Sequence, residues 1–307
     1  MPPFSLTDAA FEGFRLTRER PRVVAAWALL YALMSLITAV VMVSTIGPQF
    51  DTLRAAAQSS GPTDPAEAVE RFRKLAPFLM SILPFVVVFW SMLTCAVYRA
   101  VLRPADRGFG LIRLGGDEIR MAGLTILLWL LMLATVFASS LFITIGAMLA
   151  AGGSLVAAVF GNLIGVATLG VAIWVWIRLS LAGPVTFVSG EIHIFRSWEL
   201  TRGYFWRLVA AYGLAVVLAI VVFLLALIIF TATAGVFVTA EGHPLTDIAS
   251  MFAPNTTSLA SYFTPAQILY QAFWSILQVV VYAVLLSPAA VIYAALSGHP
   301  VNTFPHS

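Results

Sequence analysis

Charged residues are scarce in this sequence of 307 residues. Asp, Glu, Lys and Arg make up 10% of the chain, whereas 61% of it is hydrophobic. Soluble domains carry about a quarter charged residues, and a chain this apolar could not cover its surface with polar groups in water. The composition excludes an ordinary soluble protein and predicts that lipid surrounds most of the chain.

Cysteine is almost missing. The one cysteine, Cys95, lies in an apolar run, so neither an intrachain disulfide nor a cysteine metal cluster can form. We expect it to be a small buried packing residue. The first residues also lack the order of basic residues, short apolar core and small-residue cleavage site that marks a secretory signal. The apolar run after them is expected to be a retained span.

Catalytic signatures are missing as well. The sequence has no phosphate-binding loop, no dinucleotide-binding glycine pattern and no G-x-S-x-G elbow. We interpret Asp117 with Glu118, and Glu191 with His193, as solvated residues rather than as a catalytic or metal site. We therefore expect no enzyme activity, no cofactor and no metal. An intramembrane enzyme would need acids or histidines that folding gathers from distant positions.

Long apolar runs dominate what is present. A membrane span needs about 20 mainly apolar residues. Six segments satisfy this requirement, near 23–46, 76–98, 121–150, 155–177, 208–238 and 268–296. We predict an all-α membrane protein, a bundle of six transmembrane helices over 23–298. An interfacial segment at 1–22 precedes the bundle and a short tail at 299–307 follows it.

The basic residues predict the orientation of the bundle. Of the 17 Lys and Arg residues, 13 lie in the N-terminal segment and in the second and fourth connections. Basic residues gather on the cytoplasmic side of membrane proteins. We expect both termini in the cytoplasm, and topology rather than nucleic-acid binding accounts for the positive charge. Arg99 and Arg178, near the inner ends of spans, are expected to extend to the interface.

Tryptophan and arginine occur together before the fifth span. A helix over 197–207 would place Trp198, Arg202 and Trp206 on one face. Tryptophan favours the headgroup zone and arginine pairs with phosphate. We favour a membrane anchor; a specific lipid-headgroup or partner site formed by these residues with Arg178 and Arg207 is the alternative. Replacing Arg202 and Arg207 by Ala is then expected to weaken binding of anionic lipid or a partner.

The sequence predicts two further amphipathic helices, one in the N-terminal segment and one in the first outer loop. In the first, Phe4, Phe11 and Phe14 are expected on one side, with Asp8, Glu12 and Arg15 toward water. This helix lies either on the membrane or on the protein's own inner loops. In the second, a short outer helix is expected from Asp64 to about Leu75, with i,i+4 pairs of Glu67 with Arg71 and Glu70 with Lys74.

No ionisable residue lies in the central part of a predicted span, so ion-coupled transport lacks its usual sign. Gly161 and Gly165 beside Asn162 predict close helix packing. Gln271, Gln278 and Tyr282 share one face of the sixth span, and with Asn162 they are candidates for a polar pore or pocket.

A faint internal repeat links LTRERP-RVVAAW, LGGDEIRMAGL and LTRGYFWRLVAAY, each placed before an odd-numbered span. Three helical hairpins would explain it, although similarity this weak also arises by chance in apolar sequence.

The exit R-L-S-L-A-G-P from Arg178 to Pro184, followed by SW-x-LTRG-x-FWRL, resembles a group of bacterial polytopic membrane proteins. The group includes YciC-like proteins and the membrane domain of some glycerophosphodiester phosphodiesterases, and FSLTDAAFEGFRLTRERP is similar to its start. Most of the chain is covered, but only these short motifs are specific. The resemblance implies a bacterial inner-membrane protein and implies no phosphodiesterase activity.

Together these observations predict a non-enzymatic inner-membrane scaffold or accessory subunit that contacts membrane lipids or another membrane protein. The alternative is a channel or transporter for a small uncharged or amphipathic solute, with Asn162, Gln271 and Gln278 along the path.

Overall fold

Six long apolar helices form the molecule. The computed structural model describes residues 4–50, 55, 65–103, 105–106, 108–151, 155–240 and 255–298, and within them every regular element is helical. Each long helix contains one predicted span and is long and apolar enough to cross a membrane. The fold is therefore that of a multi-pass helical membrane protein, as predicted. The long helices are α2 (Pro21–Ile46), α4 (Pro65–Leu102), α5 (Gly116–Ala151), α6 (Leu155–Leu179), α9 (Phe205–Ala240) and α12 (Pro265–Ser297).

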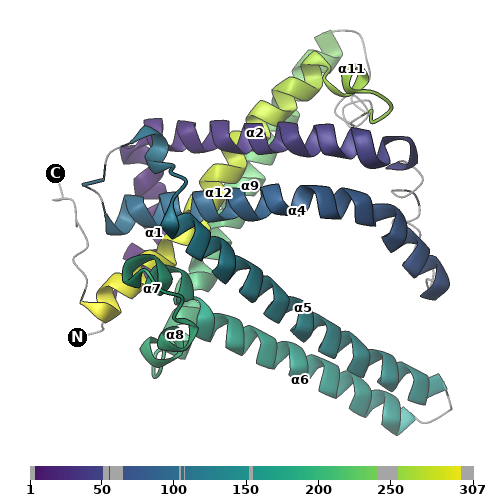
Figure 1. The fold of residues 1–307 in the computed structure, drawn as a ribbon, viewed down its shortest axis with the longest axis vertical. Coiled ribbons are helices and arrows are strands. Elements are labelled where there is room, and N and C mark those ends of the chain that lie inside the picture. Colours follow the sequence, from purple (N-terminus) through teal and green to yellow (C-terminus); the bar gives the residue numbers. More distant parts are fainter. Residues whose placement is uncertain are drawn as a thin grey trace.

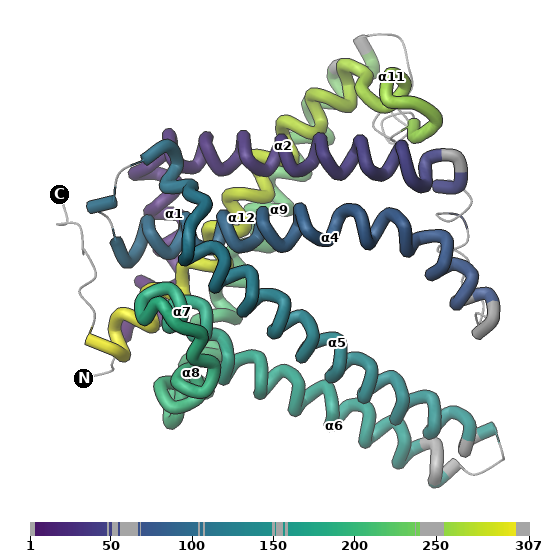
Figure 2. The backbone as a smooth tube through the Cα atoms, in the orientation of Figure 1, coloured from purple at the N-terminus to yellow at the C-terminus, as the bar shows by residue number. Residues whose placement is uncertain are grey.

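The helices converge at one end of the molecule and spread at the other (Figure 1). Helices α2 and α4 run side by side, the α5–α6 hairpin diverges from α4, and α9 and α12 cross behind α2 and α4 (Figure 2). We call the convergent end the compact end and the opposite one the open end. Short elements gather at the compact end: α1 (Leu6–Glu19), η2 (Phe109–Leu111), α7 (Ala182–Ser189) and α8 (Ile194–Leu200). Two more, η1 (Gly47–Gln49) and α11 (Leu259–Tyr262), lie toward the open end.

Local sequence explains several helix boundaries. Ser5 caps α1 by accepting a hydrogen bond from the Asp8 amide, and Thr264 caps α12 by accepting one from the Gln267 amide. Pro21 and Pro265 occupy the first positions of α2 and α12, where a missing N–H costs nothing. The helices therefore begin where capping chemistry permits.

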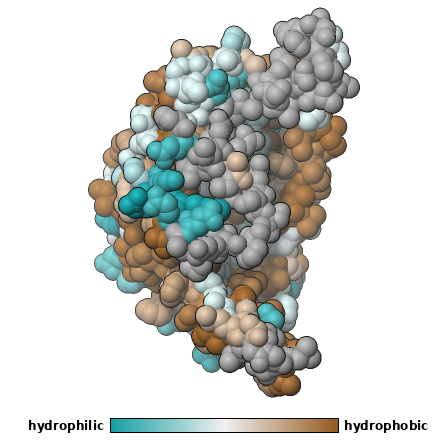
Figure 3. All heavy atoms as spheres, turned by 90° about the vertical axis from the view of Figure 1, so that its right-hand side faces the viewer, coloured by the Kyte–Doolittle hydropathy of each residue, from teal (hydrophilic) through white to brown (hydrophobic). Residues whose placement is uncertain are grey.

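The predicted outer helix is continuous with the second span. Helix α4 has 38 residues, or about 57 Å at 1.5 Å per residue, which exceeds a hydrocarbon core of about 30 Å. Its first turns carry the predicted pairs, Arg71 with Glu67 at 2.5 Å and Lys74 with Glu70 at 3.9 Å. Figure 3 views the open end, where a small hydrophilic patch lies beside hydrophobic atoms. Charged turns thus extend α4 beyond its apolar part.

Helix α1 packs on α12 and α9, which favours docking on the protein over lying on the membrane. A Cβ on Gly13 would lie 2.4 Å from the Cα of Val284, so only glycine permits this approach. The predicted division of its faces is correct for Asp8, which is exposed, and wrong for Glu12, which is 7% exposed, and Phe11, which is 49% exposed. Gly13 packs directly on α12, and Phe4 and Leu16 are buried in the core.

Burial is concentrated at the compact end. Trp27, Leu93, Leu181 and Leu208 are fully buried there, and Cys95 is buried as predicted. The hairpin instead exposes large side chains such as Leu133, at 65%. Its two helices touch closely: a Cβ on Gly161 would lie 2.1 Å from the Cα of Gly146. A lipid environment accounts for this exposed apolar surface.

Candidate functional site

Arg178 and Trp198 meet at the compact end, between α6 and α8. The guanidinium carbon of Arg178 lies 5.6 Å from the ring centre of Trp174 and 5.7 Å from that of Trp198. The two indoles pack edge to face with centres 4.8 Å apart. The Ser197 hydroxyl donates to the Arg178 carbonyl at 2.7 Å, which fixes α8 to the end of α6. The arginine is thus held over two aromatic rings.

The Arg178 guanidinium has unused donors. Its Nε and Nη1 atoms are buried and have no hydrogen-bond partner in the described part of the chain. A buried donor without an acceptor costs about 1–3 kcal/mol. Arginine presents its N–H groups in a fork that matches carboxylate and phosphate oxygens. Because protein atoms cover these two donors, an anionic group from outside the chain reaches them only if the guanidinium moves outward.

The other three residues of the predicted cluster lie apart from this pair. The predicted helix over 197–207 is wrong, because α8 ends at Leu200, a turn follows, and α9 starts at Phe205. Gly203 in the turn has φ of +85°, a conformation that favours glycine. Trp206 is the second residue of α9, is 78% exposed and packs on Phe205. Arg202 is exposed in the turn, and Arg207 is half-buried on α9.

The pore candidates lie on two different helix pairs. Asn162 is on α6, beside the Gly161 contact, whereas Gln271, Gln278 and Tyr282 are on α12. Gln271 accepts a hydrogen bond from the Ser35 hydroxyl at 2.7 Å and donates one to the Tyr262 hydroxyl at 3.3 Å. Tyr282 packs on Trp90 with ring centres 4.7 Å apart. Gln271 and Tyr282 therefore connect α12 to its neighbours.

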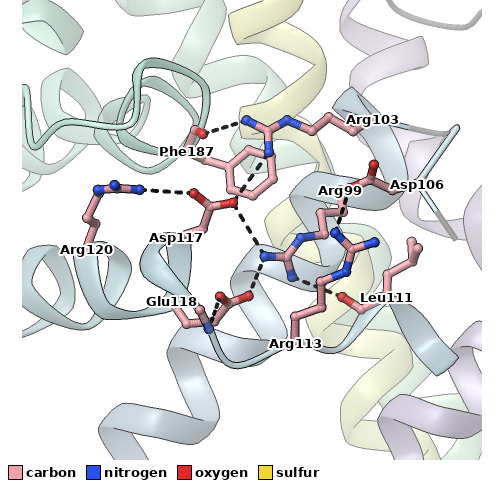
Figure 4. A network of polar contacts seen from close by, with 10 residues as sticks. Arg99, Arg103, Asp106, Leu111, Arg113, Asp117, Glu118, Arg120 and Phe187 are labelled. Carbon is pink, nitrogen blue, oxygen red and sulfur yellow. Dashed lines mark hydrogen bonds and ion pairs between the residues drawn. The ribbon is translucent and has the colours of Figure 1, made fainter. Parts of the chain in front are cut away.

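A second polar cluster at the compact end was missed by the sequence reasoning (Figure 4). Arg99 on α4 is 2% exposed and pairs with Glu118 on α5, 4% exposed, at 2.5 Å. It also donates to the Leu111 carbonyl at 3.0 Å. Gly115 donates its amide to Glu118 at 3.0 Å, which caps the start of α5. The pair ties the α4–α5 connection to both helices.

Asp117 forms a second layer of this cluster. Its carboxylate lies 3.4 Å from Arg103 and 3.2 Å from Arg120. Arg103 also donates to the Phe187 carbonyl at 3.2 Å and lies over its ring at 4.4 Å. The connection is held from another side by Trp27, whose indole donates to the Gly110 carbonyl at 2.7 Å.

Two predictions about these charges are wrong. Glu118 is not solvated, and Arg99 does not extend to the interface, because the α4–α5 connection folds back over both. The sequence does contain a pattern that predicts this pairing: two acids in the first turn of α5 directly follow a connection rich in arginine. Glu191 and His193 pair at 2.9 Å and are exposed, as predicted. Among the described residues no cluster of His, Cys, Asp or Glu could hold a metal ion.

Comparison with known protein families, curated proteins and solved structures finds no match to this chain. The resemblance to YciC-like proteins therefore stays a prediction, and function is argued from the site itself.

Proposed function

We propose that this chain is a non-enzymatic integral protein of a bacterial inner membrane that binds anionic lipid headgroups at Arg178 and Trp198. The observation that carries the proposal is the pair of buried Arg178 donors, Nε and Nη1, without a partner in the described chain. A lipid phosphate that drew the half-buried guanidinium toward the surface would supply the missing acceptors, and a charge-assisted hydrogen bond is about twice as strong as a neutral one.

The surroundings of Arg178 support a headgroup rather than a soluble anion. Trp174 and Trp198 supply apolar ring faces with one N–H each, the character that places tryptophan at membrane interfaces. Arg202 is exposed close to α8, and basic residues near a membrane surface attract anionic lipid by about 1 kcal/mol each. In this proposal Arg178 binds the phosphate, while Arg202 and Arg207 add a weaker, salt-dependent attraction.

The pairing of Asp117 and Glu118 with arginines supports a non-enzymatic role. Glu118 is neutralised by Arg99, and Asp117 by Arg103 and Arg120. A general base needs a carboxylate within reach of substrate, and these carboxylates are engaged by arginines. Scaffolding or accessory contact with another membrane protein remains part of the proposal, with the same lipid-facing surface as the contact.

The test is lipid retention by the purified full-length protein, measured by native mass spectrometry with phosphatidylglycerol and phosphatidylcholine added in equal amounts. We expect selective retention of phosphatidylglycerol and a loss of about tenfold in Arg178→Gln, since a hydrogen bond to a charged group contributes about 1.5–3 kcal/mol. Arg202→Gln should lower retention less, and only at low salt.

The matched control is Arg73→Gln. Arg73 is exposed on the first turns of α4 and pairs with Glu70 at 3.0 Å, far from the compact end. Retention equal in wild type, Arg178→Gln and Arg73→Gln would reject the proposal, provided that all three proteins are monodisperse.

A further inference from the structure

A cavity of about 390 Å³ lies in the wedge where the α5–α6 hairpin leaves α4, and we call it the wedge cavity. Its walls come from α4, α5, the end of α6 with the start of α7, and one residue of α12. Three tryptophans line it: Trp90, Trp129 and Trp176. Small-molecule sites have volumes of about 300–1,000 Å³, so the wedge cavity is of ligand size.

The cavity runs along the membrane-spanning direction. Its lining residues on α5 extend from Met121 to Met132, a rise of about 16 Å. This length equals about half of a 30 Å hydrocarbon core, the thickness of one leaflet. At the compact end Gly183 of α7 abuts Tyr98, where a Cβ would lie 2.5 Å from the tyrosine hydroxyl. A ligand therefore enters sideways from the lipid, between the diverging helices, and not from the compact end.

Three lining residues carry a hydroxyl group without a hydrogen-bond partner in the described chain: Tyr98, beside Gly183, and two threonines. Thr94 on α4 and Thr125 on α5 line it, and neither hydroxyl makes a hydrogen bond within the described chain. The other described threonines of the long helices donate to a carbonyl three or four residues back, as Thr135 does to Met132 at 2.8 Å. Thr94 and Thr125 are thus free to bond a ligand, and in hydrocarbon such a bond has no competition from water.

Among the residues that the structure describes, none that lines the wedge cavity is charged. Arg99 directly follows the lining residue Tyr98, and Glu118 lies three residues before Met121, but the two are already paired with each other. A charged headgroup drawn into this site would lose its hydration without gaining a counter-charge, which is strongly unfavourable. The ligand must therefore be uncharged, with hydroxyl or ester oxygens for the two threonines and a long apolar chain for the tryptophan-lined walls.

A second copy of the chain fits the cavity less well. A helix is about 10 Å wide, so a stretch of about 16 Å would need on the order of 1,000 Å³, well above the space present. We infer that the wedge cavity binds an uncharged two-chain lipid of the diacylglycerol class, with one acyl chain in the cavity and its glycerol oxygens at Thr94 and Thr125.

This inference is independent of the headgroup site. Trp174 and Arg178 lie on one face of α6, and Trp176 and Ser180 lie on another, because residues two apart point in opposed directions on a helix. Arg178→Gln is therefore expected to leave binding in the wedge cavity unchanged.

The experiment is photolabelling of the full-length protein in nanodiscs with a diacylglycerol that carries a diazirine in one chain. We expect labels on the α4 and α5 residues that line the cavity, and competition by unlabelled diacylglycerol but not by phosphatidylglycerol. Thr94→Val and Thr125→Val remove the hydroxyls at nearly constant volume. Each should weaken labelling about fivefold, the equivalent of one neutral hydrogen bond.

Thr135→Val is the matched control, because Thr135 lies on the same helix, outside the cavity lining, and is already bonded to its own backbone. Thr125→Phe, which fills the cavity, is expected to abolish labelling. Three results would overturn the inference: even labelling of all lipid-facing helices, equal labelling of the two Val variants and wild type, or cross-linking between two copies in place of lipid labelling.

Discussion

At the scale of single residues, two arginines near the compact-end termini of α4 and α6 have opposite environments. Arg99 is fully buried and paired with Glu118. Arg178 instead lies over two indole rings, and two of its N–H-bearing nitrogens have no hydrogen-bond acceptor in the described chain. A buried pair is not strong evidence for stability by itself, because the cost of removing both charges from water offsets their attraction. Removing one partner is different, because the other charge is then buried alone.

Glu118→Ala is therefore expected to destabilise the protein by about 3–5 kcal/mol, the usual cost of an orphaned buried charge. Thermal unfolding in detergent, followed by tryptophan fluorescence, measures this as a lowered Tm. Glu70→Ala removes a partly exposed partner from an i,i+4 pair and should change stability by less than about 0.5 kcal/mol. Equal effects of the two substitutions would show that the Arg99–Glu118 pair does not stabilise the compact end.

At the scale of elements, α1 illustrates how the side chains of a short amphipathic helix decide whether it packs on lipid or on protein. Ala9, Ala10 and Gly13 form a flat strip that packs closely on α12, and this brings Glu12 into the contact. Arg15 pairs with Glu12 at 2.6 Å and offsets part of the cost. Burial raises the pKa of Glu12 above its ordinary value of 4.5, and Arg15 acts against this shift.

Docking of α1 is therefore expected to depend on pH. Since the docked helix has the higher Glu12 pKa, it binds the proton more tightly than the undocked helix. Docking should be strongest below pH 4.5 and should weaken as pH rises through the raised pKa. Hydrogen exchange of residues 6–19, corrected for the intrinsic pH dependence of exchange, measures this.

Glu12→Gln should remove this pH response, and Asp8→Asn, at an exposed position of the same helix, should keep it. A response that survives in Glu12→Gln would assign the titration to another group.

At the scale of the whole molecule, the six helices separate into a compact end and diverging pairs. The hairpin of α5 and α6 leaves the bundle, and its two backbones approach very closely where Gly146 meets Gly161. Small residues let helix backbones approach, which compensates for the missing hydrophobic driving force in lipid.

Gly161→Val should force α5 and α6 apart by about 1–2 Å near the contact, because carbon atoms prefer separations of about 3.5–4.0 Å. Spin labels on the exposed residues Leu141 and Val166 would report the change in distance between the helices. Gly170→Val, on the same helix with nothing within 4 Å, is the control and should leave the distance unchanged. An unchanged distance in Gly161→Val would contradict the role of this contact.

The amino-acid sequence by itself determined the six helices, because a long apolar run in lipid must satisfy its own backbone and does so as a helix. It also determined local pairs such as Glu67 with Arg71, whose four-residue spacing is a property of the helix alone. The close packing at Gly161 was predictable for the same reason, since a small-residue spacing marks one helix face.

Only the tertiary structure decided which charges are buried and where the chain leaves a cavity. Arg99 meets Glu118, and Arg178 meets Trp198, after chain reversals of about twenty residues whose geometry no local pattern encodes. The unpartnered hydroxyls of Thr94 and Thr125 line a cavity because α4 and α5 diverge. Hydropathy predicts that a residue lies within the membrane. Whether that residue faces lipid, protein or a cavity depends on how the helices cross.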